Sequence, residues 1–387
     1  MNVYLDNNAT TPLHPDVKKA IIEFLDFYGN PSSMHMDGRV VKEKITEAKN
    51  YISKFFNIDI DDFIFTSCAS EANNTILKSM LFWPEDRKHL IISKIEHPSI
   101  LETAKCLEKN GIKVSYIGVD SNGIIDLNEF EKNLNEKTGM VSIMYVNNEI
   151  GTIQPIDKIY EIIASKSPET IFFTDAVQAA GKIKLDLRKL PVNCASLSAH
   201  KLYAPKGIGL LYIRDFKKNI KKFTPLIHGG HQEKGFRAGT ENTIGIIAFG
   251  AACKALIDEI DRDIERVRNI RDYFEERVEN EISDIIINGK NADRVPGTSN
   301  ITFKKVEGES ILLRLDIDGY SVSTGSACST GSLEPSHVLM ALHKNAEIAH
   351  GSIRFSFGRE NDIKDVDKLV ESLKNCINIL RSISPLT

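Results

Sequence analysis

Residues 171–178 read Ile171-Phe172-Phe173-Thr174-Asp175-Ala176-Val177-Gln178, an apolar run that ends in an acid and an amide. Its first four residues are aromatic or β-branched, which is typical of a buried strand. Further runs with strand-like composition are residues 90–93, 140–146 and 209–213. Residues 100–109 and 156–164 carry apolar side chains at helical spacing instead. This alternation predicts an α/β fold in which helices cover both faces of a mostly parallel sheet.

The pattern of the sequence changes after about residue 250. Apolar residues at helical spacing from Ile264 to Ile282 predict one long amphipathic helix, rich in Arg and Glu. Beyond it, residues 299–303 and 353–357 are expected to be strands, and residues 362–380 a closing helix. The sequence therefore predicts a second, smaller α+β domain.

Composition argues against several classes of protein. The chain has 387 residues, a net charge of −4 and a pI of about 6.2, so we expect neither nucleic-acid nor membrane binding. The lysine-rich residues 217–222 are interpreted as a solvated turn. No apolar run approaches the ~20 residues that cross a bilayer, and residues 1–6 lack signal-peptide features. The six cysteines lie far apart without a Cys-x-x-Cys pair, which predicts reduced thiols, no zinc site and a cytoplasmic protein.

Two charged residues follow predicted strands, where α/β sheets bind their ligands. Lys201 comes directly after small and polar residues and could form a Schiff base with an aldehyde cofactor. Asp175 could pair with the protonated pyridine nitrogen of such a cofactor. The alternatives are a surface lysine and an aspartate that caps the next helix.

Two further segments offer cofactor contacts. Residues 66–73 bring small and hydroxyl side chains to the start of a helix, where free backbone N–H groups can hold a phosphate or the residues can simply cap the helix. His97 follows another strand and could stack on a flat ring, although a histidine in a loop is usually just solvated.

In its motifs the chain resembles the NifS/IscS-type cysteine desulfurases of the class with an extended cysteine loop. The resemblance extends almost from end to end and lies in residues 4–11, 29–33, 96–98, 146–151, 175–178, 198–201, 229–233, 237–242, 325–328 and 331–337. It implies a pyridoxal 5′-phosphate (PLP) enzyme of the aminotransferase-like fold, fold type I. The large PLP-binding domain would be residues 14–255. Residues 1–13 and 256–387 would form the small domain, with the cysteine loop at about residues 321–335.

The resemblance also implies a role for each matching residue. Lys201, Cys328 and His97 would be catalytic: Lys201 would hold the cofactor covalently, Cys328 would be the nucleophile and His97 would stack on the ring. The expected cofactor-binding residues are Ala69, Ser70, His97, Asn148, Asp175, Gln178, Ser198, His200, Lys201 and, from a partner subunit, Thr240. Asn148 and Arg354 would bind the substrate carboxylate, for which arginine offers a planar two-pronged fit.

The implied reaction converts L-cysteine to L-alanine and leaves the sulfur as a persulfide on Cys328. The sulfur would serve the assembly of iron–sulfur clusters or related cofactors, so the expected partners are a second copy of the chain and a sulfur acceptor or iron–sulfur scaffold protein. We expect no metal, unless Cys328 transiently shares an iron–sulfur cluster with a scaffold.

Three other functions would use parts of the same pattern. An aminotransferase would use the same lysine, but Cys328 in its small, polar segment argues against it. A selenocysteine lyase is an open alternative, because selenocysteine could use the same site. A non-enzymatic scaffold would not need Lys201, Asp175 and Cys328 together. The chain departs from the family pattern at Leu339 and Met340, where many members carry an arginine, which leaves the choice of acceptor open.

Overall fold

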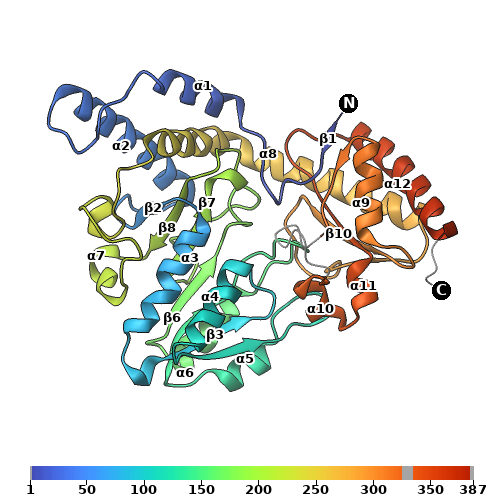
Figure 1. The fold of residues 1–387 in the computed structure, drawn as a ribbon, viewed down its shortest axis with the longest axis horizontal. Helices are drawn as coiled ribbons and strands as arrows, with labels where there is room; N and C mark the ends of the chain where they lie inside the picture. The colour runs from blue at the N-terminus through green and yellow to red at the C-terminus, as the bar shows by residue number, and fades with distance from the viewer. Residues whose placement is uncertain (1, 325–333, 384–387) are drawn as a thin grey trace.

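The computed structural model describes residues 2–324 and 334–383, which form two packed units joined by one long helix (Figure 1). The larger unit contains a seven-stranded sheet of order β2-β8-β7-β6-β5-β3-β4. Its strands are β2 (Phe63–Thr66), β3 (His89–Ser93), β4 (Lys113–Ile117), β5 (Thr138–Ser142), β6 (Ile171–Asp175), β7 (Cys194–Ser198) and β8 (Gly209–Ile213). Only β8 runs antiparallel to its neighbours, so the predicted mostly parallel sheet is confirmed.

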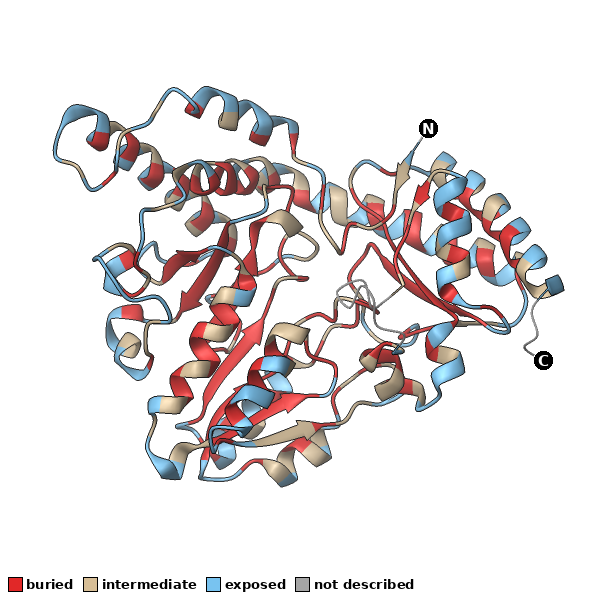
Figure 2. Ribbon diagram, viewed as in Figure 1, coloured by how far each residue is buried: buried red, intermediate tan, exposed pale blue. Residues whose placement is uncertain are grey.

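Alternate residues of each strand enter different cores, because successive side chains point to opposite faces of a sheet. In β2, Phe63 and Phe65 pack on one face and Ile64 on the other. The first face is covered by α1 (Pro15–Phe24), α2 (Met36–Phe56), α5 (Leu127–Asn133), α6 (Ile156–Lys166) and part of the long helix α8 (Thr243–Glu281). The second face is covered by α3 (Ala69–Lys78) and α4 (Pro98–Glu108). Figure 2 shows the buried strands between helices whose outer faces are exposed.

The long helix α8 (Thr243–Glu281) starts well before the predicted position near residue 264. Its first half is buried on most sides, and Gly250 lies so close to Ala48 of α2 that a Cβ atom would be 2.6 Å from the Ala48 Cα. A helix with little exposed surface lacks the amphipathic spacing that marks its second half. The prediction of one long helix was therefore right, and its start was wrong.

The smaller unit has its own core around the second half of α8. It contains a three-stranded antiparallel sheet of order β12-β10-β9 and a parallel pair of β1 with β11. Its elements are β1 (Val3–Tyr4), β9 (Ile285–Ile287), β10 (Thr298–Phe303), β11 (Tyr320–Ser321), β12 (Ser352–Ser356), α9 (Gly308–Ile317), α10 (His337–His343), α11 (Ala346–His350) and α12 (Ile363–Ile383). Along α8, Leu256 belongs to the core of the larger unit and Val267 to the core of the smaller one.

Two surface features bear on the sequence predictions. The lysine-rich run forms two short helical segments, α7 (Phe216–Asn219) and η4 (Ile220–Lys222), and its lysines are exposed. The predicted strand at residues 140–146 ends at Ser142, where the chain turns toward the cleft described below. Within the described ranges, the structure contains no helix with both the length and the apolar character needed to span a membrane.

Candidate active site

A cleft of about 580 Å³ lies beyond the carboxyl ends of the parallel strands, between the two units. Loops that follow β2, β3, β5, β6 and β7 form one wall, and β12 with residues 334–337 contributes from the smaller unit. A cleft of this size suits a small organic ligand. Its lining includes the predicted site residues Ala69, Ser70, His97, Asn148, Asp175, Gln178, Ser198, His200, Lys201 and Arg354.

Lys201 ends a short 3₁₀ turn, η3 (Ala199–Lys201), directly after β7. Its side chain is partly buried, and its Nζ donates hydrogen bonds to the carbonyl oxygens of Asn8 at 2.5 Å and Ala9 at 2.6 Å. The amine of Lys201 therefore lies in the cleft wall, against the N-terminal segment, and not on the open surface.

Asp175 is the last residue of β6 and is buried. Its Oδ2 accepts a hydrogen bond of 2.9 Å from Asn73 Nδ2, and its Oδ1 accepts one of 3.0 Å from the Val177 amide. The second bond shows that Asp175 also caps the turn after β6, at the place where the alternative interpretation expected a helix. Both donors are neutral N–H groups, which leaves the carboxylate suited to a cationic partner in the cleft.

His97 is the N-cap of α4. Its Nδ1 accepts a hydrogen bond of 3.1 Å from the Ser99 amide and lies 2.8 Å from Ser99 Oγ. Burial lowers the pKa of His97 and Lys201 adds to this, although Asp175 acts in the opposite direction. A neutral ring that accepts at Nδ1 carries its proton on Nε2, so His97 can donate a proton or a hydrogen bond from Nε2.

The proposed phosphate site lies at the start of α3, where Ala69 and Ser70 form the first turn. The N-cap Cys68 makes no side-chain capping bond, so it does not compete for the backbone N–H groups there. Ser198 and His200 approach from β7 and η3, and His200 Nδ1 lies 3.1 Å from Thr10 Oγ1. Burial, aided by nearby lysines, lowers the pKa of His200 to about 4.

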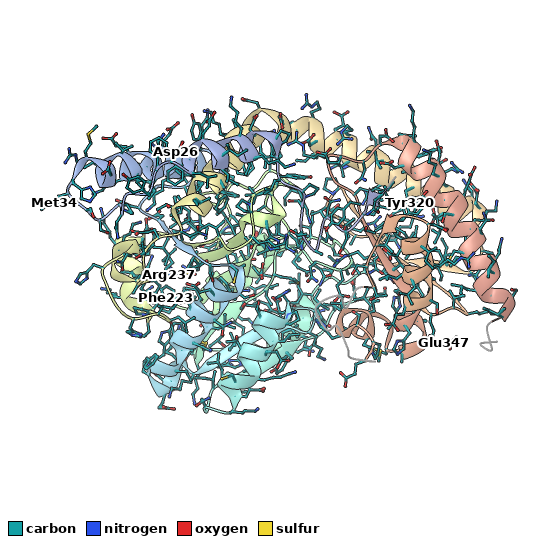
Figure 3. All side chains as sticks on the ribbon, turned by 45° about the horizontal axis from the view of Figure 1, so that its top comes forward. Asp26, Met34, Phe223, Arg237, Tyr320 and Glu347 are labelled. Carbon is teal, nitrogen blue, oxygen red and sulfur yellow. The ribbon has the colours of Figure 1, made fainter. Side chains whose placement is uncertain are left out.

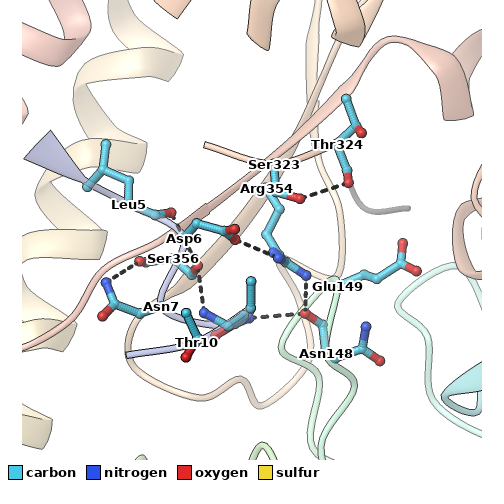
Figure 4. A network of polar contacts seen from close by, with 12 residues as sticks. Leu5, Asp6, Asn7, Thr10, Asn148, Glu149, Ser323, Thr324, Arg354 and Ser356 are labelled. Carbon is cyan, nitrogen blue, oxygen red and sulfur yellow. Dashed lines mark hydrogen bonds and ion pairs between the residues drawn. The ribbon is translucent and has the colours of Figure 1, made fainter. Parts of the chain in front are cut away.

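Arg354 projects from β12 and lines the cleft beside Asn148 (Figure 4). Its Nη2 lies 2.7 Å from Asp6 Oδ1, and its Nη1 donates to the Asn148 carbonyl oxygen at 3.0 Å. Its buried Nε has no hydrogen-bond partner among the described residues. Of the five N–H donors of the guanidinium, Asp6 and the Asn148 carbonyl oxygen thus take one each, and the Nε–H has no partner among the described residues.

Two predicted site residues do not lie in this lining. Cys328 lies outside the described residues, as do the rest of residues 325–333. Thr240 is exposed and does not line the cleft of its own chain, and its predicted role requires a second subunit. Its loop is linked to the phosphate end of the cleft, because Arg237 Nε donates to Glu71 Oε1 of α3 at 2.9 Å.

Several residues that support the site received no role from the sequence. Asn73 and Ser99 hold Asp175 and His97 as described above. The fully buried Glu96 accepts hydrogen bonds from Ser93 Oγ at 2.6 Å and from the Met144 amide at 3.0 Å, so it ties the loop after β3 to the loop after β5. Burial raises the pKa of Glu96 to about 8. Glu96 precedes His97 in a segment that matches the family, but only the folded structure shows that Glu96 connects the two loops.

The donor set of the cleft fits PLP. The cofactor needs an amine for its aldehyde, an acid for its ring nitrogen and N–H or O–H groups for its phosphate. Lys201, Asp175 and the start of α3 supply these groups within one cleft. The buried Asn73 Oδ1 has no hydrogen-bond partner among the described residues, which is expected of a wall completed by a bound group.

None of the described cysteines forms a disulfide, and most of them are buried. Cys194, Cys253 and Cys376 are buried, and burial raises the pKa of each thiol. Cys106 is exposed, and Cys68 lines the cleft. Among the described residues, no group of three or more His, Cys, Asp or Glu could hold a metal ion.

Comparisons with a family model, with known sequences and with solved structures agree with one another. Residues 3–369 match the aminotransferase class-V family model. The chain is 47% identical to the cysteine desulfurase IscS of Dictyoglomus turgidum over 385 residues, which covers 99% of this chain and 96% of that protein. A solved NifS-like protein superposes with a TM-score of 0.91 at 36% identity, covering 98% of this chain and all of that one. The protein SspA, solved in complex with cysteine, gives a TM-score of 0.81 at 32% identity, with 92% and 99% coverage.

Proposed function

Since the chain belongs to the class-V aminotransferase family, among its cysteine desulfurases, we propose that it holds PLP through Lys201 and removes sulfur from L-cysteine. One observation carries this proposal: the amine of Lys201, the carboxylate of Asp175 and the guanidinium of Arg354 line a single cleft although they come from distant segments. When bound, the cofactor supplies an electron sink that weakens bonds of the attached amino acid.

The residues of the cleft divide into three groups by their proposed roles. Lys201 would hold the cofactor and, once released by the substrate amine, would move protons as a free base. Asp175 would pair with the ring nitrogen, Gln178 would donate to the ring hydroxyl, and His97 would lie on the ring face. The phosphate would be held by Ala69, Ser70, Ser198 and His200.

Arg354 and Asn148 would hold the carboxylate of the substrate. The unpartnered Nε of Arg354 supports this role, because a buried N–H without an acceptor favours an anionic ligand. The solved complex of SspA with cysteine shows that one similar protein binds this amino acid.

The overall reaction transfers one sulfur atom to the enzyme. Cys328 as thiolate would attack the substrate sulfur, the carbon–sulfur bond would break, and its electron pair would return to the substrate carbon, which takes a proton to give L-alanine. The products are alanine and a persulfide on Cys328. No external oxidant or reductant is needed, because the two-electron oxidation of sulfur to the persulfide is balanced by the reduction of the substrate carbon, whose C–S bond is replaced by a C–H bond.

A homodimer is the proposed assembly, and an apolar surface near α1 and α2 supports it. Tyr28, Met34 and Met36 are 86%, 89% and 70% exposed, respectively, and lie with Ile22 and Leu25 in one segment. Figure 3 shows Met34 at the outer end of the larger unit. Exposed apolar residues in this number mark an interaction surface. A second copy would cover them and could bring Thr240 to the partner's phosphate. The proposed sulfur acceptor, an iron–sulfur scaffold or similar protein, rests on the resemblance. The proposed cytoplasmic location rests on the number and spacing of the cysteines.

The test is a product assay with the PLP-loaded protein, L-cysteine and a thiol reductant. We expect alanine and sulfide in equal amounts, and their loss in Lys201→Ala, which lacks the anchor and the proton carrier. An aminotransferase would release a keto acid in place of alanine, and a scaffold would release neither product. Near wild-type turnover of Lys201→Ala would overturn the proposal. Selenocysteine in place of cysteine tests the lyase alternative.

A further inference from the structure

Lys182 is a second partly buried lysine at the site, and it does not belong to the cleft lining. It lies in the turn that follows Asp175, where its amide donates to the Ala179 carbonyl oxygen at 3.1 Å. Its Nζ donates hydrogen bonds to Asn8 Oδ1 at 2.5 Å and to Gln178 Oε1. The proposed function gives Lys182 no role.

The contacts of Gln178 fix which way round its side-chain amide lies. A glutamine amide can be turned over to exchange its oxygen and its NH₂ group, and only the hydrogen-bond partners decide between the two orientations. Here Oε1 faces the Lys182 amine, which donates, while Nε2 donates to the Asn8 carbonyl oxygen at 3.0 Å. Both partners require the same orientation. The second N–H of Nε2 remains for a ligand in the cleft, which Gln178 lines.

Asn8 connects this amide to the other functional groups. Its carbonyl oxygen accepts from both Gln178 and Lys201, and its side-chain Nδ2 donates to the Asn148 carbonyl oxygen at 3.1 Å. Its Oδ1 is held by Lys182. Lys182 therefore supports Gln178 directly and also through Asn8, which is 3% exposed.

We propose that Lys182 is a positioning residue: it holds the Gln178 amide with its N–H toward the cofactor's ring hydroxyl oxygen, and so lowers the proton affinity of the nitrogen that joins Lys201 to the cofactor. The inference rests on the proposed function. A donor to an anionic ring oxygen stabilises that anion, and an anion stabilised in this way holds a neighbouring proton less tightly. If the amide turned over, its oxygen would face the ring oxygen and have the opposite effect.

The charge of Lys182 is not required for this role. Burial lowers its pKa well below the ordinary value, with repulsion from Lys201 and Arg354 and a smaller opposing effect of Asp6. A neutral amine still has two N–H donors, one for each of the two amide oxygens it contacts. Among the described residues, Lys201 also influences the pKa of His97 and of His200, and Asp175 faces His97.

The experiment is a pH titration of the visible absorption band of the PLP-loaded protein. In Lys182→Met the midpoint should rise by about one pH unit, the size expected for one hydrogen bond to a charged group. Lys182→Gln removes the charge but keeps two N–H donors, and its midpoint should stay near that of the wild type. Lys184→Met is the matched control, since Lys184 lies two residues further on, is 72% exposed and pairs with Asp261 on the surface.

A double-mutant cycle shows whether Lys182 acts through Gln178. In a Gln178→Ala background, Lys182→Met should cause no further shift. If Lys182→Met shifts the midpoint by the same amount with and without Gln178→Ala, Lys182 does not act through Gln178. If Lys182→Gln shifts the midpoint as much as Lys182→Met does, the charge of Lys182 acts directly. Either result would overturn the inference. If Lys182→Met does not fold, the Gln variant still tests it. A wild-type protein without a visible band contradicts the proposed function itself, whereas a band with the same midpoint in Lys182→Met contradicts only this inference.

Discussion

The guanidinium of Arg354 is paired with the carboxylate of Asp6, with 2.7 Å between Nη2 and Oδ1. Arg354 is the residue proposed to bind the carboxylate of the substrate, so this site already holds a carboxylate of the protein. The two charges are largely buried, with side-chain exposures of 4% for Arg354 and 19% for Asp6. Substrate binding must therefore use the N–H donors that Asp6 and Asn148 leave, or displace Asp6 from the guanidinium.

Asp6→Asn should lower the KM for L-cysteine about fivefold and leave kcat nearly unchanged. The amide oxygen keeps the hydrogen bond to Arg354, while the competing negative charge is lost; a fivefold change corresponds to ~1 kcal/mol. Arg354→Gln should raise KM by about a hundredfold, because the charge-assisted bonds are lost. Steady-state kinetics measure both. An unchanged KM in Arg354→Gln would remove Arg354 from the substrate site.

Asp175→Asn should retain the fold but lose at least about a hundredfold in kcat, because a neutral amide cannot hold the protonated ring nitrogen. Asn73→Ala should have a smaller effect, since it removes one hydrogen bond of 2.9 Å to Asp175 and leaves the charge. The measurements are kcat and the dissociation constant of PLP. If Asp175→Asn lowered kcat no more than Asn73→Ala does, the charge of Asp175 would be unimportant and Asp175 would act only as a cap.

Glu149 should make the stability of the protein depend on pH. Burial raises its pKa to about 7 from an ordinary 4.5, while Ser336 Oγ donates to its Oε2 at 2.5 Å. Between these two values the unfolded chain releases the proton and the folded protein keeps it, so the free energy of unfolding falls as pH rises from 4.5 to 7. The loss amounts to ~3 kcal/mol.

The matched variant is Glu149→Gln, which is neutral at every pH. Its unfolding temperature, measured by calorimetry at pH 5 and pH 8, should fall less between the two values than that of the wild type. A parallel pH dependence of both proteins would show that Glu149 is not protonated in the folded state.

Thr240→Ala should weaken the retention of PLP without changing the assembly, because Thr240 is proposed to reach the phosphate of the neighbouring subunit. Replacement of Met34 by Asp should instead weaken the dimer, since it places a charge on the apolar segment that a second copy would cover. Sedimentation analysis and PLP titration separate the two effects. A fully active monomer at assay concentration would contradict the proposed assembly.

The sequence predicted the fold and two residues of the cleft for a physical reason, whereas most of the other lining residues were expected from the resemblance to a known family. Lys201 and Asp175 follow strands, and the ends of parallel strands meet at one edge of a sheet, so local pattern was sufficient to bring them together. Asn8 is different: it contacts Gln178 and Lys201 across more than 160 residues, and only the packed fold shows this. The start of α8 at Thr243 was missed because residues 245–253 are apolar and buried or partly buried on every side, so they show no amphipathic spacing.

The central claim, that sulfur from L-cysteine passes to Cys328, is tested most directly by mass spectrometry of the PLP-loaded protein after brief exposure to L-cysteine. We expect one added sulfur, about 32 Da, on the Cys328 peptide, and none on the peptide of Cys68, which lines the cleft and is the internal control. Cys328→Ser should bind PLP and cysteine but pass no sulfur on, because a hydroxyl cannot form a persulfide. Added sulfur on Cys68 together with a fully active Cys328→Ser would contradict the account.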